Sequence, residues 1–246
     1  MNAHPEGVAV ALSFFVINYW IMKKTKEKYK YIILVRHGEP NNPKKIVYNL
    51  DEVMKKEDII HITVDGKKQL RALGKVINQK KFRVVRIRYS NQIRAVESAL
   101  EINKALKVKD AKVEPRLRDV YAPGGYLERM TMDELKRQPG NIYNRSRWRK
   151  YHHETPESII KRFDDVFQET KNNLKSDETA ILLSHGDPIA WWINFKVMNK
   201  LPDSKQLRNL IYPVQGQGLM VVLDSENKII KHYYLKDPEL LLGKSY

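Results

Sequence analysis

Apolar and polar positions along the chain follow two patterns, one typical of β-strands and one typical of amphipathic helices. Segments 31–36 (YIILVR) and 179–185 (TAILLSH) are apolar almost throughout, as strands buried on both faces of a sheet are. Each of them runs directly into a histidine followed by glycine. The other strands that we expect are 82–90, 112–120 and a closing hairpin made of 218–224 and 229–235.

Apolar residues three or four positions apart predict amphipathic helices over 65–79, 91–106 and 156–174. The side chains expected to be buried are Leu70, Leu73, Val76 and Ile77 in the first helix, Ile93, Val96 and Leu100 in the second, and Ile159, Ile160, Phe163, Val166 and Phe167 in the third. Asp187 and Pro188 predict the N-cap and first turn of a further helix. A proline and paired glycines predict a loop over 121–126.

Strands that alternate with helices in this way favour an α/β fold. We expect a single three-layer domain over residues 31–246, with a mainly parallel central sheet and helices on both faces. In such sheets ligands bind at the carboxyl ends of the strands. The sequence has no internal repeat and no low-complexity linker that would divide this domain.

Residues 1–30 differ from the rest, because an apolar run over 8–22 is followed by a lysine-rich stretch. As a helix the run would be about 23 Å long, shorter than a bilayer core of roughly 30 Å. It lacks the preceding positive charge and the cleavage site of a secretory signal. Three interpretations stay open: a membrane anchor with the domain on the cytoplasmic side, a helix packed on the domain, or a start upstream of the natural one, which would then be Met22.

Composition limits the possible partners and compartments. The chain has 246 residues, a formal net charge of +16 and no cysteine. The absence of cysteine excludes disulfides, thiolate nucleophiles and cysteine-based zinc sites, and it fits a cytoplasmic protein. The positive charge points to an anionic partner: nucleic acid, an acidic membrane surface or a phosphorylated molecule. No nucleic-acid-binding motif is present, so nucleic acid has only the net charge in its favour.

Charged and nucleophilic side chains follow the predicted strands where those strands end. They are Arg36, His37 and Gly38 at the end of the first strand, Ser90 and then Arg94 at the end of the second, Asp119 near the end of the third, and His185 and Gly186 at the end of the fourth. Arginine matches phosphate oxygens with paired hydrogen bonds. A histidine beside such cations is held neutral and can attack phosphorus. We therefore expect a phosphate site with a histidine nucleophile, where each glycine lets the backbone turn sharply.

One histidine at a strand end would mean little, but two histidine–glycine pairs after two apolar strands favour a functional site. The other histidines, which we interpret as surface or packing residues, are His4, His61, His152, His153 and His232. Adjacent side chains such as His152 and His153 diverge, and no carboxylate is spaced to complete a metal site. We expect neither a metal nor a cofactor.

Five motifs in order resemble those of the histidine phosphatase superfamily, the group that includes cofactor-dependent phosphoglycerate mutases. They are RHG at 36–38, SNQIRA at 90–95, LRDVYAPGGYLERMTMDEL at 117–135, TPESII at 155–160 and LLSHGDP at 182–188. The similarity in order and rough spacing extends from Tyr31 to about Leu223. It implies a phosphoglycerate mutase-like fold and a metal-independent phosphomonoester hydrolase.

The resemblance also implies roles for individual residues. His37 would attack the phosphoryl group, and Arg36, Arg94, His185 and Gly186 would bind its oxygens. The acid of the family is commonly glutamate, but the matching position here is Asp119, with Glu128 as an alternative. Asn42 would touch the phosphate, although Asn41 and Asn42 are out of register with the asparagine of the mutases.

Alternative functions are a mutase-type phosphoryl transferase and a non-catalytic phosphate-binding module. A mutase needs a closed, dry site, and the roughly 215 residues after position 30 leave little chain for closing elements. The substrate would be a phosphorylated small molecule or a phosphoprotein. The basic segment 141–153 is interpreted as a solvated face, with guidance of an anionic substrate as the alternative. Membrane contact would be made through residues 8–22.

Overall fold

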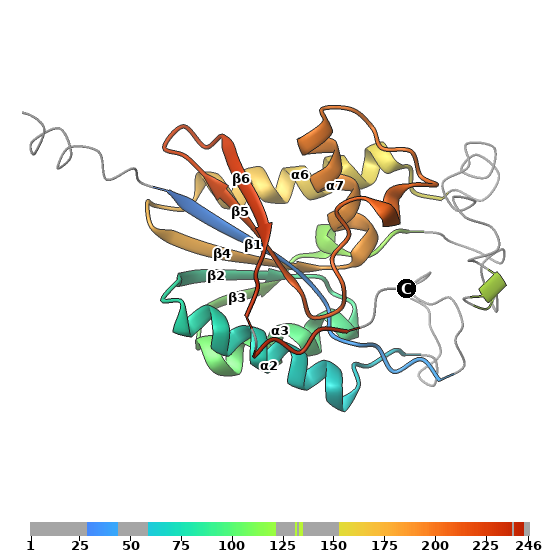
Figure 1. The fold of residues 1–246 in the computed structure, drawn as a ribbon, viewed down its shortest axis with the longest axis horizontal. Coiled ribbons are helices and arrows are strands. Elements are labelled where there is room, and N and C mark those ends of the chain that lie inside the picture. The colour runs from blue at the N-terminus through green and yellow to red at the C-terminus, as the bar shows by residue number, and fades with distance from the viewer. Residues whose placement is uncertain are drawn as a thin grey trace, which may run out of the picture.

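A computed structural model of the chain describes residues 29–43, 59–121, 131, 133–134, 153–237 and 239–243 (Figure 1). Several sequence predictions lie outside these residues: the apolar run 8–22, Glu128, most of the loop 121–126 and the basic segment 141–152. Among the helices within the described ranges, none has the length and apolar character needed to cross a membrane.

The described domain is built on one six-stranded mixed sheet with the strand order β3-β2-β4-β1-β5-β6. The strands are β1 Lys30–Arg36, β2 Arg83–Tyr89, β3 Asp110–Val113, β4 Glu178–Ser184, β5 Gly218–Leu223 and β6 Ile229–Tyr234. The pairs β3–β2, β2–β4 and β4–β1 are parallel, whereas β1–β5 and β5–β6 are antiparallel. The prediction of an α/β domain with a mainly parallel sheet and a closing hairpin is confirmed.

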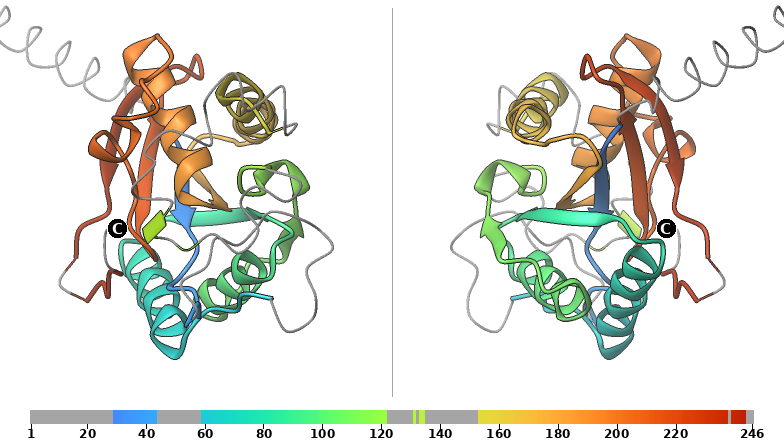
Figure 2. Two further views of the ribbon diagram at one scale, coloured as in Figure 1. Left: turned by 90° about the vertical axis from the view of Figure 1, so that its right-hand side faces the viewer. Right: turned by 90° about the vertical axis from the view of Figure 1, so that its left-hand side faces the viewer.

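Helices cover both faces of this sheet (Figure 2). One face packs against α2 (Val64–Gln79) and α3 (Ile93–Leu106), and the other against α6 (Pro156–Asn172) and α7 (Gly186–Met198). Strand β1 contributes to both cores, because successive side chains of a strand point to opposite faces. Its Ile33 and Val35 join the core under α2 and α3, and its Ile32 and Leu34 join the core under α6 and α7.

Two of the predicted apolar stripes are buried as expected. Helix α2 buries Leu70, Leu73, Val76 and Ile77, and helix α6 buries Ile159, Ile160, Phe163, Val166 and Phe167. Thr155 caps α6 by accepting a hydrogen bond from the Ser158 N–H. Helix α6 is therefore a well-anchored element, and this matters for the site described below.

The predicted buried face of α3 is wrong. Ile93 and Leu100 are 40% and 58% exposed, whereas Arg94, Ser98 and Glu101 are buried. The reason is that polar groups have partners inside the protein. Glu101 pairs with Arg71 of α2 at 2.5 Å, and the Ser98 hydroxyl donates to the Arg94 carbonyl at 2.6 Å. The spacing of apolar residues therefore predicts the wrong buried face for α3.

The predicted strand over 112–120 is also wrong beyond its first residues. Strand β3 ends at Val113, and a 3₁₀ helix, η2 (Pro115–Leu117), follows it. Proline has no N–H to continue a ladder, and the Glu114 carboxylate accepts from the Arg116 N–H at 3.1 Å to start the turn. Asp119 thus lies after a 3₁₀ helix, on a segment without regular structure, and not at a strand end.

Helix α7 begins earlier than predicted. Its N-cap is His185, with φ −121° and ψ 166°, and not Asp187, which lies in the first turn together with Pro188. The helix therefore starts directly at the end of β4. This short connection fixes His185 between a buried strand and a buried helix.

Candidate active site

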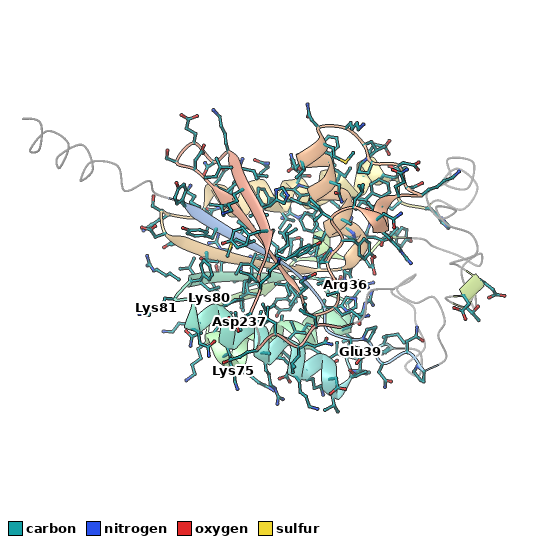
Figure 3. All side chains as sticks on the ribbon, viewed as in Figure 1. Arg36, Glu39, Lys75, Lys80, Lys81 and Asp237 are labelled. Carbon is teal, nitrogen blue, oxygen red and sulfur yellow. The ribbon has the colours of Figure 1, made fainter. Side chains whose placement is uncertain are left out.

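The two histidine–glycine pairs lie side by side because β1 and β4 are neighbouring parallel strands. The register pairs Arg36 with Ser184, and the His37 N–H continues the ladder by donating to the Ser184 carbonyl at 3.1 Å. The rings of His37 and His185 follow, with their centroids 5.1 Å apart. In Figure 3 Arg36 and Glu39 lie on one side of the domain, and Lys80 and Lys81 lie on the other. Because Arg36 ends β1 and pairs with Ser184 at the end of β4, the two histidines lie at the carboxyl ends of these parallel strands.

His37 is buried and held in one tautomer. Its Nδ1 lies 2.7 Å from the carbonyl oxygen of Gly38, and a carbonyl can only accept, so Nδ1 carries the proton. The lone pair is then on Nε2. Burial lowers the pKa of His37 well below its usual value, and the charges of Arg94 and Arg36 lower it further. His37 is therefore a neutral imidazole with one unprotonated nitrogen.

His185 is buried beside it and is also neutral. Its Nε2 lies 3.0 Å from the Ser90 hydroxyl, which accepts from the Gln92 N–H at 3.3 Å. A hydroxyl that accepts there can donate to Nε2, which leaves the proton of His185 on Nδ1, 3.4 Å from Asp119 Oδ2. Burial lowers the pKa of His185 well below its usual value, with Arg94 and His37 adding to the effect.

Two buried arginines complete the cationic side of the site. Arg36, at the end of β1, donates from Nη1 to the Pro213 carbonyl at 3.1 Å and lies over the Tyr212 ring, 5.4 Å from its centroid. Arg94, in the first turn of α3, donates from Nη2 to Asp119 Oδ2 at 2.9 Å and to Gln92 Oε1 at 3.2 Å. Both guanidinium groups are thereby oriented by contacts within the protein.

Asp119 is the acid that the structure brings to this cluster. Its Oδ1 accepts from the Val120 N–H at 2.9 Å, and its Oδ2 faces Arg94 and His185. Burial raises the pKa of Asp119, opposed by the charge of Arg94, and the Asp187 carboxylate raises it further. A carboxyl in this environment can hold a proton at higher pH than a solvated aspartate does.

The two glycines are required for close packing and not for a left-handed backbone conformation. Neither has a positive φ. A Cβ at Gly38 would lie 2.6 Å from the Gly66 carbonyl oxygen, and one at Gly186 would lie 2.5 Å from the Tyr212 hydroxyl. The absence of a side chain lets α2 and Tyr212 approach the strand ends.

The other residues singled out from the sequence include Asn42, Glu128, His61 and His153. Asn42 lies beyond Pro40, whose carbonyl accepts from the Asn42 N–H at 3.1 Å, and its contact with substrate stays a prediction. Glu128 lies outside the described residues. His61 pairs with Glu97 at 2.8 Å on the surface, and His153 is buried. In the described ranges no group of three or more histidine or acidic side chains is arranged to hold a metal ion.

Sequence reasoning missed several residues that shape this site. Ser98 is one, and its hydroxyl accepts from the Gly38 N–H at 3.0 Å; a helical spacing of four from Arg94 could have indicated it. Gln92, Tyr212, Glu154 and Arg162 are the others. Gln92 Oε1 accepts from the Asp119 N–H at 3.0 Å, and Tyr212 donates to Asp187 at 2.5 Å. These contacts join distant parts of the chain, and no local pattern signals them.

Comparison with known proteins agrees with this geometry. A profile of the histidine phosphatase superfamily (branch 1) matches residues 32–206. The structure of a mycobacterial glucosyl-3-phosphoglycerate phosphatase has a TM-score of 0.61 and 16% identity, over 84% of this chain and 97% of that one. Bacillus stearothermophilus YhfR has a TM-score of 0.62 and 18% identity, over 82% and 95%. A search of curated proteins found no match. At these identities the solved structures show a shared fold, and the profile shows that the chain belongs to the histidine phosphatase superfamily.

Proposed function

We propose that this protein is a phosphomonoester hydrolase that acts through a covalent phosphohistidine on His37. The observation that carries the proposal is the state of that residue: a buried, neutral imidazole with an unprotonated Nε2, flanked by two oriented guanidinium groups. A neutral imidazole nitrogen is a competent nucleophile toward phosphorus. A surface that only bound phosphate would have no need to suppress the charge of two histidines.

In the first step Nε2 of His37 attacks phosphorus and the bond from phosphorus to the ester oxygen breaks. Arg36, Arg94 and His185 stabilise the charge on the three remaining phosphoryl oxygens, because preoriented donors act where charge develops. Asp119 gives its proton to the departing oxygen. The products are an alcohol, an ionised Asp119 and a phosphorylated His37.

Binding of the substrate would itself prepare the acid. The Nη2 group of Arg94 donates to Asp119 in the structure described here. A phosphoryl group that engages Arg94 competes for that donor and weakens the interaction that favours ionised Asp119. The pKa of Asp119, already raised by burial, then rises further. The acid is therefore most completely protonated when a substrate is present.

In the second step water hydrolyses the phosphohistidine. The Asp119 carboxylate takes a proton from a water molecule while the oxygen of that water attacks phosphorus. The bond from phosphorus to Nε2 of His37 breaks at the same time. His37 returns to its neutral form and inorganic phosphate leaves. A mutase would instead return the phosphoryl group to an organic acceptor, which requires that water be excluded at this step.

The test is to trap the intermediate in the full-length protein. Rapid quenching during turnover of a labelled phosphomonoester should give an acid-labile, base-stable phosphoryl label on His37, and activity should persist in EDTA. His37→Ala should abolish the label, whereas His232→Ala, on β6, should keep it. Full activity in His37→Ala would refute the mechanism. Loss of activity in EDTA would refute the metal-independent part alone, and a persistent label without phosphate release would favour the mutase.

The natural substrate is best sought in a panel of phosphosugars, nucleotides and phosphopeptides. Phosphorylated sugar acids belong early in that panel, because one solved structure with this fold is a glucosyl-3-phosphoglycerate phosphatase. The buried guanidinium groups of Arg36 and Arg94 suit a terminal phosphate in each case. The panel identifies the class of substrate by the highest kcat/KM.

A further inference from the structure

Asp119 lies on a segment whose backbone is held by side chains. Residues 118–121 follow η2 and belong to no helix or strand, so their carbonyl and N–H groups need other partners. Several of these partners come from two residues that the chemistry above does not use. They are Glu154, just before α6, and Arg162, within α6.

Arg162 uses all five of its N–H donors at this place. Nε and Nη2 donate to the two carboxylate oxygens of Glu154 at 2.5 and 3.0 Å. Nη1 donates to the carbonyls of Arg116 and Arg118 at 2.6 and 2.8 Å, and Nη2 also donates to the carbonyl of Asp119 at 3.2 Å. Arginine offers five donors in a planar fork, and lysine offers three on one nitrogen. The contact with the acid's own backbone is therefore specific to arginine.

Glu154 holds the other side of the same segment. Its side chain is 4% exposed, and its Oε2 accepts from the Tyr121 N–H at 3.0 Å. Its own N–H donates to the Tyr121 carbonyl at 2.7 Å. Arg162 thus binds the backbone at Asp119, and Glu154 binds it two residues later at Tyr121. The two side chains are also bonded to each other.

We infer that Glu154 and Arg162 are a positioning pair that sets where the general acid stands. An aspartate has a single methylene, so the reach of its carboxyl depends on the position of its backbone. Helix α6 is fixed to the sheet through Phe163 and Phe167, and the pair transfers that rigidity to Asp119. The inference rests on the proposed function, because it assumes that Asp119 protonates the leaving oxygen.

The test compares two leaving groups. A phenol of low pKa departs without protonation, whereas an alkyl alcohol needs the acid. Full-length Arg162→Lys keeps the charge but loses the fork. We expect its kcat/KM for glycerol 2-phosphate to fall about tenfold or more relative to that for p-nitrophenyl phosphate, because a small displacement of a reacting group is costly. Glu154→Gln should shift the ratio of the two kcat/KM values in the same direction.

The matched control is Arg71→Lys, which alters a helix-borne arginine paired with the buried Glu101 on the opposite face of the sheet. Its ratio should equal that of the wild type. Inhibition by vanadate should be unchanged in Arg162→Lys, since Arg36 and Arg94 are intact. In an Asp119→Asn background, Arg162→Lys should change the ratio no further.

The outcomes separate the inference from the proposed function. An Asp119→Asn variant that lowers the ratio, beside Arg162→Lys and Glu154→Gln variants that leave it unchanged, would overturn the positioning pair alone. Equal losses on both substrates would do the same, since they would indicate a general structural role. An Asp119→Asn variant with the ratio of the wild type would overturn the acid assignment, and the inference would fall with it. If Arg162→Lys does not fold, the ratio in Glu154→Gln decides.

Discussion

The cationic and acidic sides of this site are positioned by different means. Arg36 is the last residue of β1, His37 follows it, His185 follows β4 and Arg94 stands in the first turn of α3. Backbone hydrogen bonds of regular elements therefore set the backbone positions of these residues. Asp119 stands on an irregular segment, and side chains from α6 and its N-terminal flank hold it.

This difference bears on which reaction each side can support. The strand register sets the backbone positions of Arg36, His37 and His185. Side-chain contacts then orient individual groups of the cationic side, as Gln92 and Asp119 do for Arg94. The backbone of the acid half is held by long side chains, those of Glu154 and Arg162, and not by a strand ladder. Changes on the cationic side should therefore affect every phosphoester, and changes on the acidic side should affect those with poor leaving groups.

The largest effect is expected from Asp119→Asn with alkyl phosphates. The amide cannot donate a proton to the leaving oxygen, and kcat/KM should fall by about 10³-fold, within the range of general acid catalysis. The phosphorylation burst with an activated aryl phosphate should be largely retained, although steady-state turnover falls if water activation also needs the carboxylate. Glu128→Gln serves as the comparison variant. If it shows this pattern and Asp119→Asn does not, Glu128 is the acid.

Arg94→Lys tests the cationic side. Lysine keeps the charge but loses the planar pair of donors, so the rate should fall by roughly 10²-fold, as for the loss of one transition-state donor. The loss should be similar for alkyl and aryl phosphates, unlike that in Asp119→Asn. The control is Arg88→Lys, because Arg88 lies on β2 and pairs at 3.0 Å with Asp110 of β3. A near-normal rate in Arg94→Lys would place this residue outside the phosphate site.

The two sides also differ in how far the sequence predicts them. Apolar runs that end in histidine and glycine identify β1 and β4, and adjacent parallel strands bring His37 and His185 together. Arg94 was expected at the site even though the buried face of α3 was predicted wrongly, because the motif and not the periodicity indicated it. A helix that buries polar residues at a functional site departs from the apolar periodicity, so a prediction based on that periodicity selects the wrong face.

The acidic side could be predicted only as a residue and not as a structure. Pro115 breaks the expected strand, and the position of Asp119 is then set by Glu154 and Arg162, which lie more than 30 positions further along the chain. Such contacts leave no periodic signal. Arg162 looks like any charged residue on the exposed face of an amphipathic helix until the fold places it against the segment.

The pH dependence should sharpen the same comparison. The pKa of His37 is lowered from 6.5, so its unprotonated form persists into the acid range and activity should fall only below pH 6.5. The pKa of Asp119 is raised from 3.8, so its protonated form is lost as the pH rises through that higher value. Alkyl phosphates should therefore show an acidic optimum, with at most a tenfold loss per pH unit on each limb.

The pH profile of kcat/KM is best compared between the wild type and Asp119→Asn with the same alkyl substrate, because the ionisation of the substrate then affects both profiles equally. The alkaline limb of kcat/KM should disappear in Asp119→Asn, whereas the acid limb should remain. An acid limb that begins above pH 6.5 would contradict the neutral state assigned to His37. An alkaline limb that persists in Asp119→Asn would assign it to another group.

The smallest expected effect concerns Gln92, a side chain that contacts both the cationic and the acidic side. Gln92 Oε1 accepts from Arg94 at 3.2 Å and from the Asp119 N–H at 3.0 Å. Gln92→Leu keeps the size but removes this acceptor, and the loss of a typical hydrogen bond costs about 1 kcal/mol. We expect about a fivefold fall in kcat/KM for alkyl and aryl phosphates alike, because both sides of the site lose one contact. Gln168→Leu, on α6, is the matched control, since its amide bonds Asp164 at 3.1 Å away from the cluster. A fall confined to alkyl phosphates would assign Gln92 to the acidic side alone, and the contacts of Asp119 with Arg94 and His185 would then join the two halves without it.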